Sequence, residues 1–249
     1  MAKPISLEKI LFSQGFGTRR YCADLVYADL VKVNGVLAED PDERISTEGL
    51  TLNVDGKDWE YHEKAYIVFN KPLNYECSHK TTHHASVYSL LPAPFVERGL
   101  QCVGRLDYDT TGLLLISDDG QFIHKMTTPK KNIGKVYEIT AANAITQSQI
   151  DHLLNGVVLD DDPRPCYATA CQLISENVLA MTIVEGRYHQ VKRMMAAVGN
   201  HVAQLHRTQI GGYLMPKDLP EGQWRWLYPD DLRLLSQSVD TNEAKLSKV

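Results

Sequence analysis

Several features of membrane-bound and secreted proteins are missing from this sequence. No apolar run approaches the ~20 residues that a membrane-spanning helix needs. The first residues, Met1-Ala2-Lys3-Pro4, lack the apolar segment of a secretory signal. Five cysteines, an odd number without any Cys-x-x-Cys pair, argue against a disulfide framework and for reduced thiols. We therefore expect a cytoplasmic protein that contacts no membrane.

A metal-binding spacing is missing as well. The nine histidines show no spacing that would bring them together with acidic side chains, as metal sites built from these residue types require. We therefore expect no bound metal.

The composition is that of a folded protein with room for two domains. Hydrophobic residues make up 43% of the chain and charged residues 23%, which is enough apolar material for a sizeable core. A length of 249 residues is long for one small domain and comfortable for two.

Acidic residues are absent from two long windows, although the whole chain has a net charge of −5. The 18 residues between Asp119 and Glu138 carry four lysines, and the 32 residues between Glu185 and Asp218 carry five basic residues. With these windows at +4 and +5, the rest of the chain carries −14. Such a distribution can present one positive face to phosphates, or it can reflect two solvated basic surfaces.

Helix and strand signals form a first group that ends near residue 60. Ser6 and Thr18 stand where they can cap two short helices. The Asn34-Gly35 turn then predicts a hairpin over 31–36, with further short strands after it. Two helices followed by short strands thus define an N-terminal domain over residues 1–60.

The pattern after residue 60 predicts a larger second domain over 61–235. Strands are expected at 66–69, 113–117, 135–141, 167–174, 178–184 and 201–206, and helices at 120–127, 146–154 and 188–198. Because the strands and helices do not alternate strictly, the pattern favours an α+β domain with a mixed, mainly antiparallel sheet flanked by helices. Residues 236–249 are polar and aperiodic, so a disordered tail is expected there.

The strongest chemical signal is GRLDYDTTGLLLI, residues 104–116. Gly104 and Gly112 allow tight turns on either side of a polar loop, and the apolar residues that follow predict a buried strand. A carboxylate such as Asp107 on this loop can act as a nucleophile or a proton acceptor. Arg105 and Asp107 could equally form a structural ion pair.

The motif G-R-L-D-x-x-T-x-G-L resembles the catalytic motif of the pseudouridine synthases, in the branch that also carries an S4-type RNA-binding domain. Three further segments fit that family in the same order, namely Asn70-Lys71-Pro72, Lys135-Val136-Tyr137 and EGRYHQVKRM at 185–194. The resemblance extends from about residue 4 to about residue 230. It implies an S4-like RNA-binding domain over 1–60 and a catalytic domain over 61–235.

The resemblance implies catalytic roles for Asp107, Tyr137 and Lys192. Asp107 is the carboxylate that assists the isomerisation of uridine, and an ionised carboxylate in a dry site needs a cationic partner. Lys192 stands where the family has that partner. Its helical spacing places it at the edge of an apolar stripe, where a lysine can face a cleft or only cover the rim of the core. Tyr137 is implied as the ring beneath the flipped uracil, whereas its strand pattern alone suits a core aromatic.

Further basic residues of the same motifs are expected to bind RNA: Arg105, Lys71, Lys135, Arg187, His189 and Arg193, and in the S4-like domain Arg19 and Arg20. Lys135 shares a strand face with Tyr137, which suits a phosphate beside a stacked base. The family often has glycine at the position of Asn74, and asparagine tolerates the left-handed backbone that such a turn requires.

The N-terminal domain departs from the family pattern in two respects. Ser6 replaces the arginine of the usual Arg-Leu-x-Lys, and residues 1–60 contain seven basic and eleven acidic residues. Phosphate contacts supply much of the affinity for nucleic acid. We therefore expect this domain to orient the RNA while the second domain supplies most of the binding.

The predicted partner is ribosomal RNA or a pre-ribosomal particle, and small-subunit (16S) RNA is preferred because residues 185–207 are most similar to enzymes acting on it. No small-molecule cofactor is expected, since the isomerisation is redox-neutral, and the chain is expected to be a monomer. One alternative function is a pseudouridine synthase that acts on large-subunit (23S) RNA. The other is a non-catalytic RNA-binding factor of ribosome assembly on the same fold. Asp107 and Asp109 together would also suit a glycoside hydrolase, whose two carboxyls lie about 5–9 Å apart.

Overall fold

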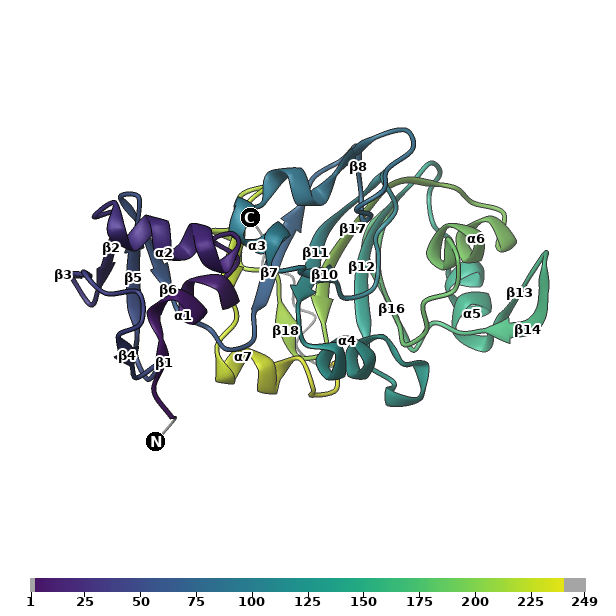
Figure 1. Cartoon of the computed structure of the whole chain (residues 1–249). Helices are drawn as coiled ribbons and strands as arrows, with labels where there is room; N and C mark the ends of the chain where they lie inside the picture. The colour runs from purple at the N-terminus through teal and green to yellow at the C-terminus, as the bar shows by residue number, and fades with distance from the viewer. Residues whose placement is uncertain (1–2, 240–249) are drawn as a thin grey trace. The chain divides into compact units, whose positions relative to one another are not determined.

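The computed structural model describes residues 3–239, and the chain forms two compact units (Figure 1). The first unit comprises Met1–Ala65 and Leu91–Gln101, and the second comprises Tyr66–Leu90 and Cys102–Val249. The first unit therefore includes a later segment that the expected division at residue 60 leaves out. The expected tail at 236–249 lies outside the described residues from residue 240 onward.

The two expected helices of the first unit are α1 (Leu7–Ser13) and α2 (Arg19–Tyr27). The Thr18 hydroxyl accepts a hydrogen bond from the Tyr21 amide at 3.2 Å and caps α2 as predicted. Ser6 occupies the N-cap position of α1 but forms no side-chain cap. The first two amides of α1 donate instead to the carbonyls of Glu43 and Pro41 at 3.0 and 2.9 Å, so the cap that sequence predicted at Ser6 is not needed.

The strands of the first unit are β1 (Ile5–Ser6), β2 (Val31–Val33), β3 (Val36–Leu37), β4 (Arg44–Ile45), β5 (Thr51–Val54) and β6 (Lys57–Glu60). Four of them form an antiparallel sheet in the order β3-β2-β5-β6, and β1 pairs with β4. Asn34 and Gly35 both have positive φ (48° and 85°), as two-residue hairpin turns require, so the predicted hairpin is confirmed. The apolar faces of α1 and α2 pack on this sheet around Leu11, Val26 and Leu52.

The later segment of the first unit contains α3 (Ala93–Glu97). Phe95 has no exposed surface, and its ring centroid lies 5.0 Å from that of Trp59. Gly15 has φ +87°, and a Cβ on it would lie 2.0 Å from the carbonyl oxygen of Pro94. Only glycine permits this approach, which explains why the first helix ends where it does.

The second unit is built on a mixed sheet. Its strands and short helices are β7 (Tyr66–Lys71), β8 (Tyr75–Glu76), β9 (Ala85–Ser86), η1 (Val87–Leu90), β10 (Gln101–Cys102), β11 (Thr110–Ser117), η2 (Pro129–Lys131), β12 (Lys135–Ala141), β13 (Val157–Leu159), β14 (Asp162–Cys166), β15 (Ala170–Ser175), β16 (Val178–Ile183), β17 (Val202–Ile210), β18 (Tyr213–Leu214) and β19 (Trp224–Trp226). Within residues 3–239 the main sheet has nine strands. Seven follow the path β15-β16-β12-β17-β11-β7-β19, while β10 pairs with β11 and β18 pairs with β17.

Only one pair along this path is parallel. β11 and β17 run parallel, and the other neighbours on the path are antiparallel. The expected α+β class with a mixed, mainly antiparallel sheet is therefore confirmed. The central strand β11 is buried along almost its whole length, and Leu113 and Leu115 pack with Val68 in the core beneath it.

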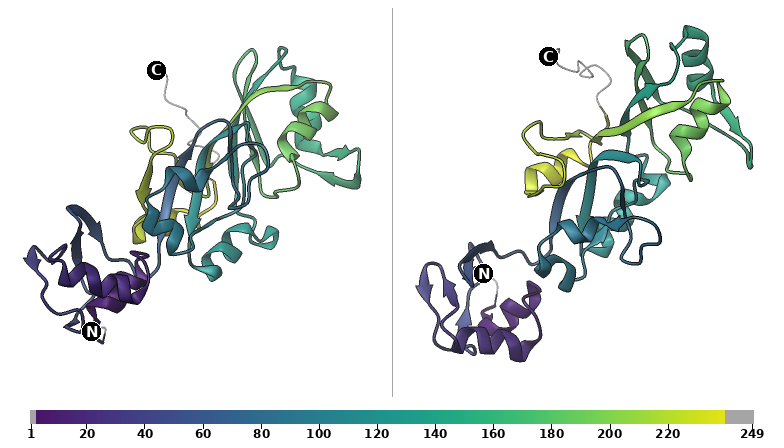
Figure 2. Two further views of the ribbon diagram at one scale, coloured as in Figure 1. Left: turned by 45° about the horizontal axis from the view of Figure 1, so that its top comes forward. Right: turned by 90° about the horizontal axis from the view of Figure 1, so that it is seen from above.

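The described part of the second unit contains four α-helices: α4 (Gly120–Thr127), α5 (Gln147–Asn155), α6 (Gln190–Ala197) and α7 (Pro229–Leu234). Thr146 and Gln149 form a capping box at the start of α5. The helix therefore begins one residue later than the expected range 146–154. The hairpin β13–β14, which the sequence pattern does not predict, projects beside α5 and α6 (Figures 1 and 2). Asn74 has φ 64°, so the left-handed turn expected there is present.

Candidate active site

Lys71 supports the loop that carries Asp107. Its side chain has no exposed surface, and its ammonium donates to the carbonyls of Thr110, Pro72 and Tyr108 at 2.9, 3.0 and 3.4 Å. Burial lowers the pKa of Lys71. The side chain is thus fully occupied by contacts within the protein, and the expected RNA contact of Lys71 stays a prediction. Its position at the end of β7, paired with Gly112 of β11, makes it a support for the loop backbone.

Gly112 allows β11 to approach β17 closely. It has φ +100°, and a Cβ on it would lie 2.4 Å from the carbonyl oxygen of Arg207. The second glycine of the motif is therefore required by the parallel pairing of these two strands.

Lys192 of α6 contacts two carboxylates of the loop. Its Nζ lies 3.1 Å from Oδ2 of Asp107 and 2.5 Å from Oδ1 of Asp109. Burial lowers the pKa of Lys192, but the hydrogen bonds to Asp109 and Asp107 outweigh burial and raise the pKa above its usual value. The cluster is partly accessible, since 30% of the Asp107 side chain and 24% of the Lys192 side chain are exposed.

His189 approaches Asp107 from the start of the same helix. It is the N-cap residue of α6 with φ 48° and ψ 32°, in the left-handed region that a non-glycine residue seldom adopts. Its Nε2 lies 3.4 Å from Oδ1 of Asp107, and its ring stacks on Tyr188 with centroids 3.8 Å apart. The helix therefore begins at Gln190, two residues later than expected, because His189 turns toward the carboxylate.

Tyr137 lies on β12 beside Arg207 of β17. The two residues are register partners next to an irregularity in the pairing. The Nη1 of Arg207 donates to the Tyr137 hydroxyl at 3.3 Å, and the guanidinium carbon lies 5.8 Å from the centre of the ring. Tyr137 is largely buried, at 8% exposure, and its position is fixed by this contact.

Two cavities meet at Tyr137. The smaller, of about 90 Å³, is lined by Asp107, Lys192 and His189 together with apolar residues such as Ile183 and Leu205. The larger, of about 410 Å³, has among its lining residues Lys135, Arg164, Arg207 and Glu185. Both are also lined by Arg105, Tyr137, Gly186 and Arg187. The three residues expected to be catalytic thus line one cavity.

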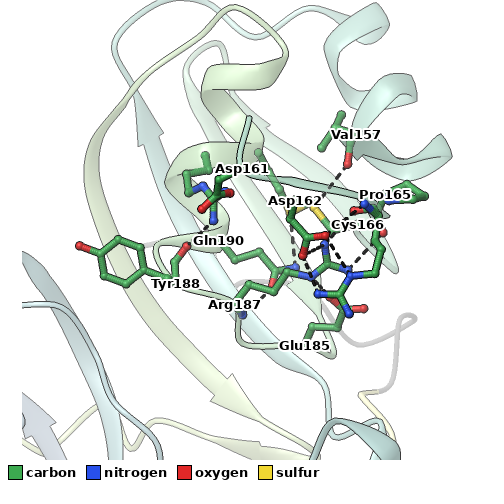
Figure 3. Close-up of polar contacts among 12 residues, drawn as sticks. Val157, Asp161, Asp162, Pro165, Cys166, Glu185, Arg187, Tyr188 and Gln190 are labelled. Carbon is green, nitrogen blue, oxygen red and sulfur yellow. Dashed lines mark hydrogen bonds and ion pairs between the residues drawn. The ribbon is translucent and has the colours of Figure 1, made fainter. Parts of the chain in front are cut away.

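Arg187 connects the hairpin β13–β14 to the loop before α6 (Figure 3). Its guanidinium donates to Glu185 at 2.7 Å, to Asp162 at 3.2 Å, and to the carbonyls of Arg164 and Pro165 at 2.8 and 3.3 Å. Arg164, with a smaller contribution from Arg187, keeps the pKa of Asp162 well below its usual range. Most donors of Arg187 are therefore used within the protein.

The remaining expected RNA contacts lie in different environments. Arg105 is exposed on the loop, whereas Arg193 donates to the Tyr188 carbonyl at 3.0 Å and forms an ion pair with Asp161. In the first unit, Arg19 and Arg20 are exposed at the start of α2.

Residues 3–239 contain no group of three or more His, Cys, Asp or Glu side chains able to hold a metal. Within the same residues, no helix is long and apolar enough to cross a bilayer.

Sequence reasoning did not assign a role to Arg207. It belongs to the basic window between Glu185 and Asp218 and follows Leu205-His206 in a family-like segment, but its burial against Tyr137 depends on strand pairing. Asp109 was considered only as half of a hydrolytic pair. In the structure, Asp109 forms an ion pair with Lys192, the same ammonium that contacts Asp107.

The fold and this site define an enzyme of the RNA pseudouridylate synthase family, to which the chain belongs. The family matches residues 65–197. The resemblance inferred from the four motifs is thereby confirmed, and the hydrolase interpretation of Asp107 and Asp109 is wrong.

Individual relatives agree with this family. The chain is 35% identical over 228 residues to a Vibrio parahaemolyticus protein called ribosomal small subunit pseudouridine synthase A, covering 91% of this chain and 97% of the relative. It is 39% identical over 171 residues to the Escherichia coli K12 protein of the same name, covering 69% and 74%. A crystal structure of a pseudouridylate synthase superposes with a TM-score of 0.66 at 32% identity and covers 93% of this chain and 99% of that one.

Proposed function

We propose that this pseudouridine synthase isomerises one specific uridine of small-subunit (16S) ribosomal RNA, with Asp107 as the catalytic carboxylate. The observation that supports the proposal best is the 3.1 Å contact between Lys192 and Asp107 in a cavity that Tyr137 also lines. The ion pair holds the Asp107 carboxyl group in the cavity, next to the ring of Tyr137.

The proposed chemistry needs a carboxylate and no oxidant or reductant. Asp107 assists cleavage of the bond between N1 of uracil and C1′ of the ribose. The base turns, a bond forms between C5 and C1′, C5 loses its proton and N1 gains one, so the product is an isomer of the substrate. A uridine inside folded RNA must first leave its stack, and the ring of Tyr137 offers a surface for the extruded base.

The choice of small-subunit RNA draws on the relatives. The proteins from Vibrio parahaemolyticus and Escherichia coli are named for the small subunit, and the first of them is matched over nearly its whole length. Residues 1–60 are proposed to act as an S4-like RNA-binding domain, with the exposed Arg19 and Arg20 facing the RNA. We further propose that the enzyme works as a monomer in the cytoplasm, where ribosomal RNA is assembled into particles.

The test compares the wild-type protein with Asp107→Asn on 16S and 23S RNA, as transcripts and as assembling particles. Wild-type protein is expected to form pseudouridine at one position of 16S RNA, and Asp107→Asn at none. Asp160→Asn is the matched control, because Asp160 is exposed and lines neither of the two cavities at Tyr137. Activity of Asp107→Asn would refute the role of Asp107.

Mapping in a deletion strain decides the substrate. Loss of one pseudouridine from 16S RNA supports the proposal, whereas loss from 23S RNA assigns the enzyme to the large subunit. Binding of RNA without isomerisation by the purified wild-type protein would favour the assembly-factor alternative.

A further inference from the structure

The larger cavity beside Tyr137 holds more positive charge than the isomerisation uses. Five cations line it, together with a single carboxylate, Glu185: Arg105, Lys135, Arg164, Arg187 and Arg207. That carboxylate accepts a hydrogen bond from Arg187 at 2.7 Å. Arg164 likewise forms an ion pair with Asp162 at 2.7 Å. Two of the five cations therefore have acidic partners. Of the other three, Arg105 is exposed, whereas Lys135 is half-buried and Arg207 is buried.

Arg207 is buried without a counter-ion among the described residues. Only 3% of its surface is exposed. Its Nε donates to the Leu113 carbonyl at 2.7 Å and its Nη1 to the Tyr137 hydroxyl, while Nη2 has no hydrogen-bond partner within the described chain. A buried guanidinium with neutral partners and one unsatisfied nitrogen is costly, so an anion in the adjoining cavity would lower its energy.

Lys135 is half-buried and also lacks an acidic partner among the described residues. Its Nζ donates to the Ile133 carbonyl at 3.0 Å, and none of the ion pairs found within residues 3–239 includes Lys135. Burial, and secondly the charge of Arg207, lower the pKa of Lys135 to about 8. The two cations thus repel one another across a cavity whose walls include the apolar side chains of Leu115, Met126 and Ile210. In such a partly dehydrated space an anion is attracted more strongly than in water.

We propose that this cavity binds a phosphodiester group of the RNA strand beside the uridine, between Lys135 and Arg207. This inference rests on the proposed function, because the strand that delivers a uridine to Asp107 carries a phosphate on each side of it. The two cavities share Arg105 and Tyr137 as lining residues, so a base in one and a neighbouring phosphate in the other lie on a continuous path.

The surface around the cavity has the charge that such a strand requires. Thr127 and Pro129 line the cavity, and both belong to the window between Asp119 and Glu138 that contains no acidic residue. Lys130 and Lys131 follow on η2 and are exposed. The RNA backbone can therefore continue from the cavity over a basic surface.

The test uses short RNA oligonucleotides that contain the target uridine, with each flanking phosphodiester replaced in turn by an uncharged methylphosphonate. Binding is measured by fluorescence anisotropy at several salt concentrations. Lys135→Gln is expected to weaken binding about tenfold and to reduce the salt slope by about one unit. One methylphosphonate is expected to produce the same loss in the wild-type protein and no additional loss in Lys135→Gln.

Two control variants separate a local contact from general charge or misfolding. Lys135→Arg keeps the cation and is expected to retain the salt slope. Lys80→Gln removes an exposed lysine that lines neither cavity and is expected to change nothing. A full salt slope in Lys135→Gln, or equal losses on charged and uncharged linkages, would overturn the proposal.

Failure of this site is distinguishable from failure of the proposed function. Pseudouridine formation with no effect of Lys135→Gln on binding would refute the phosphate site alone. Conversely, the expected linkage-dependent loss in a wild-type protein that forms no pseudouridine would support the phosphate site and refute the proposed function.

Discussion

The ammonium of Lys192 lies 2.5 Å from Oδ1 of Asp109, closer than the 3.1 Å that separates it from Oδ2 of Asp107. One cation therefore serves two carboxylates, of which Asp109 is the more exposed. Burial lowers the pKa of Lys192, but the hydrogen bonds that its ammonium donates to both carboxylates outweigh burial and raise the pKa. Asp109 accordingly helps to keep Lys192 charged and in place beside Asp107.

Replacing Asp109 by asparagine tests this arrangement. Because one of the two anions that raise the pKa of Lys192 is lost, Lys192 is expected to lose its proton at lower pH than in the wild type. The rate at neutral pH should fall by less than about tenfold, while the alkaline limb of the pH profile moves to lower pH. Short single-turnover reactions between pH 8 and 11 measure the limb. Asp109→Glu should restore it, and an unchanged limb in Asp109→Asn would contradict the role.

Replacing Lys192 by methionine distinguishes a site lysine from one that merely covers the rim of the core. The variant leaves Asp107 and Asp109 without their shared cation, and we expect a rate loss of about 100- to 1,000-fold. The cluster is partly exposed, so unfolding free energy should change by about 1 kcal/mol or less. Single-turnover rates and urea denaturation measure the two effects. A rate near that of the wild type, or a stability loss that accounts for the inactivity, would show that Lys192 is only structural. Lys192→Arg keeps the charge and should retain more activity.

Local signals in the sequence predicted the elements whose ends are set by neighbouring residues. Thr146 with Gln149 and the Asn34-Gly35 turn are examples, and both work through contacts within a few residues. The hairpin β13–β14 was missed because Pro163 and Pro165 lie in its second strand, and proline argues against a strand. Since β14 pairs with β13 alone, the prolines cost no hydrogen bonds to a second neighbour.

The candidate site could be predicted only as far as its motifs reach. Asp107 and Lys192 occupy family positions and do lie in contact. Arg207 faces Tyr137 through a shifted pairing of β12 and β17, which neither strand reveals by itself. From the sequence, Lys71 is expected to contact phosphate. Its carbonyl acceptor at Thr110 lies 39 residues away in the chain, so the local pattern does not show that the ammonium is used within the protein. The local sequence pattern therefore does not predict contacts between segments that are distant in the chain.

The buried role of Lys71 leads to a stability prediction. In Lys71→Met three carbonyls lose their donor, and unsatisfied buried acceptors are costly, so unfolding free energy is expected to fall by about 2–4 kcal/mol. Urea denaturation measures the change. Lys80→Met is the control, since Lys80 is exposed and its replacement should matter by less than about 0.5 kcal/mol. Equal stability of the two variants would return Lys71 to the group of RNA-contacting lysines.

Arg187 and Arg105 provide a matched pair for separating support from RNA binding. Arg187 donates to two carboxylates and two carbonyls, and lysine cannot reproduce this forked geometry. In Arg187→Lys we expect faster hydrogen exchange in residues 157–166, a rate loss of about tenfold, and an unchanged salt slope for RNA binding. Arg105 is exposed where both cavities meet, so Arg105→Gln should instead reduce the salt slope by about one unit. Hydrogen-exchange mass spectrometry and salt titrations measure both variants. The reverse result, in which Arg187→Lys weakens RNA binding and leaves the hairpin protected, would show that its guanidinium leaves Asp162 and Glu185 to bind phosphate.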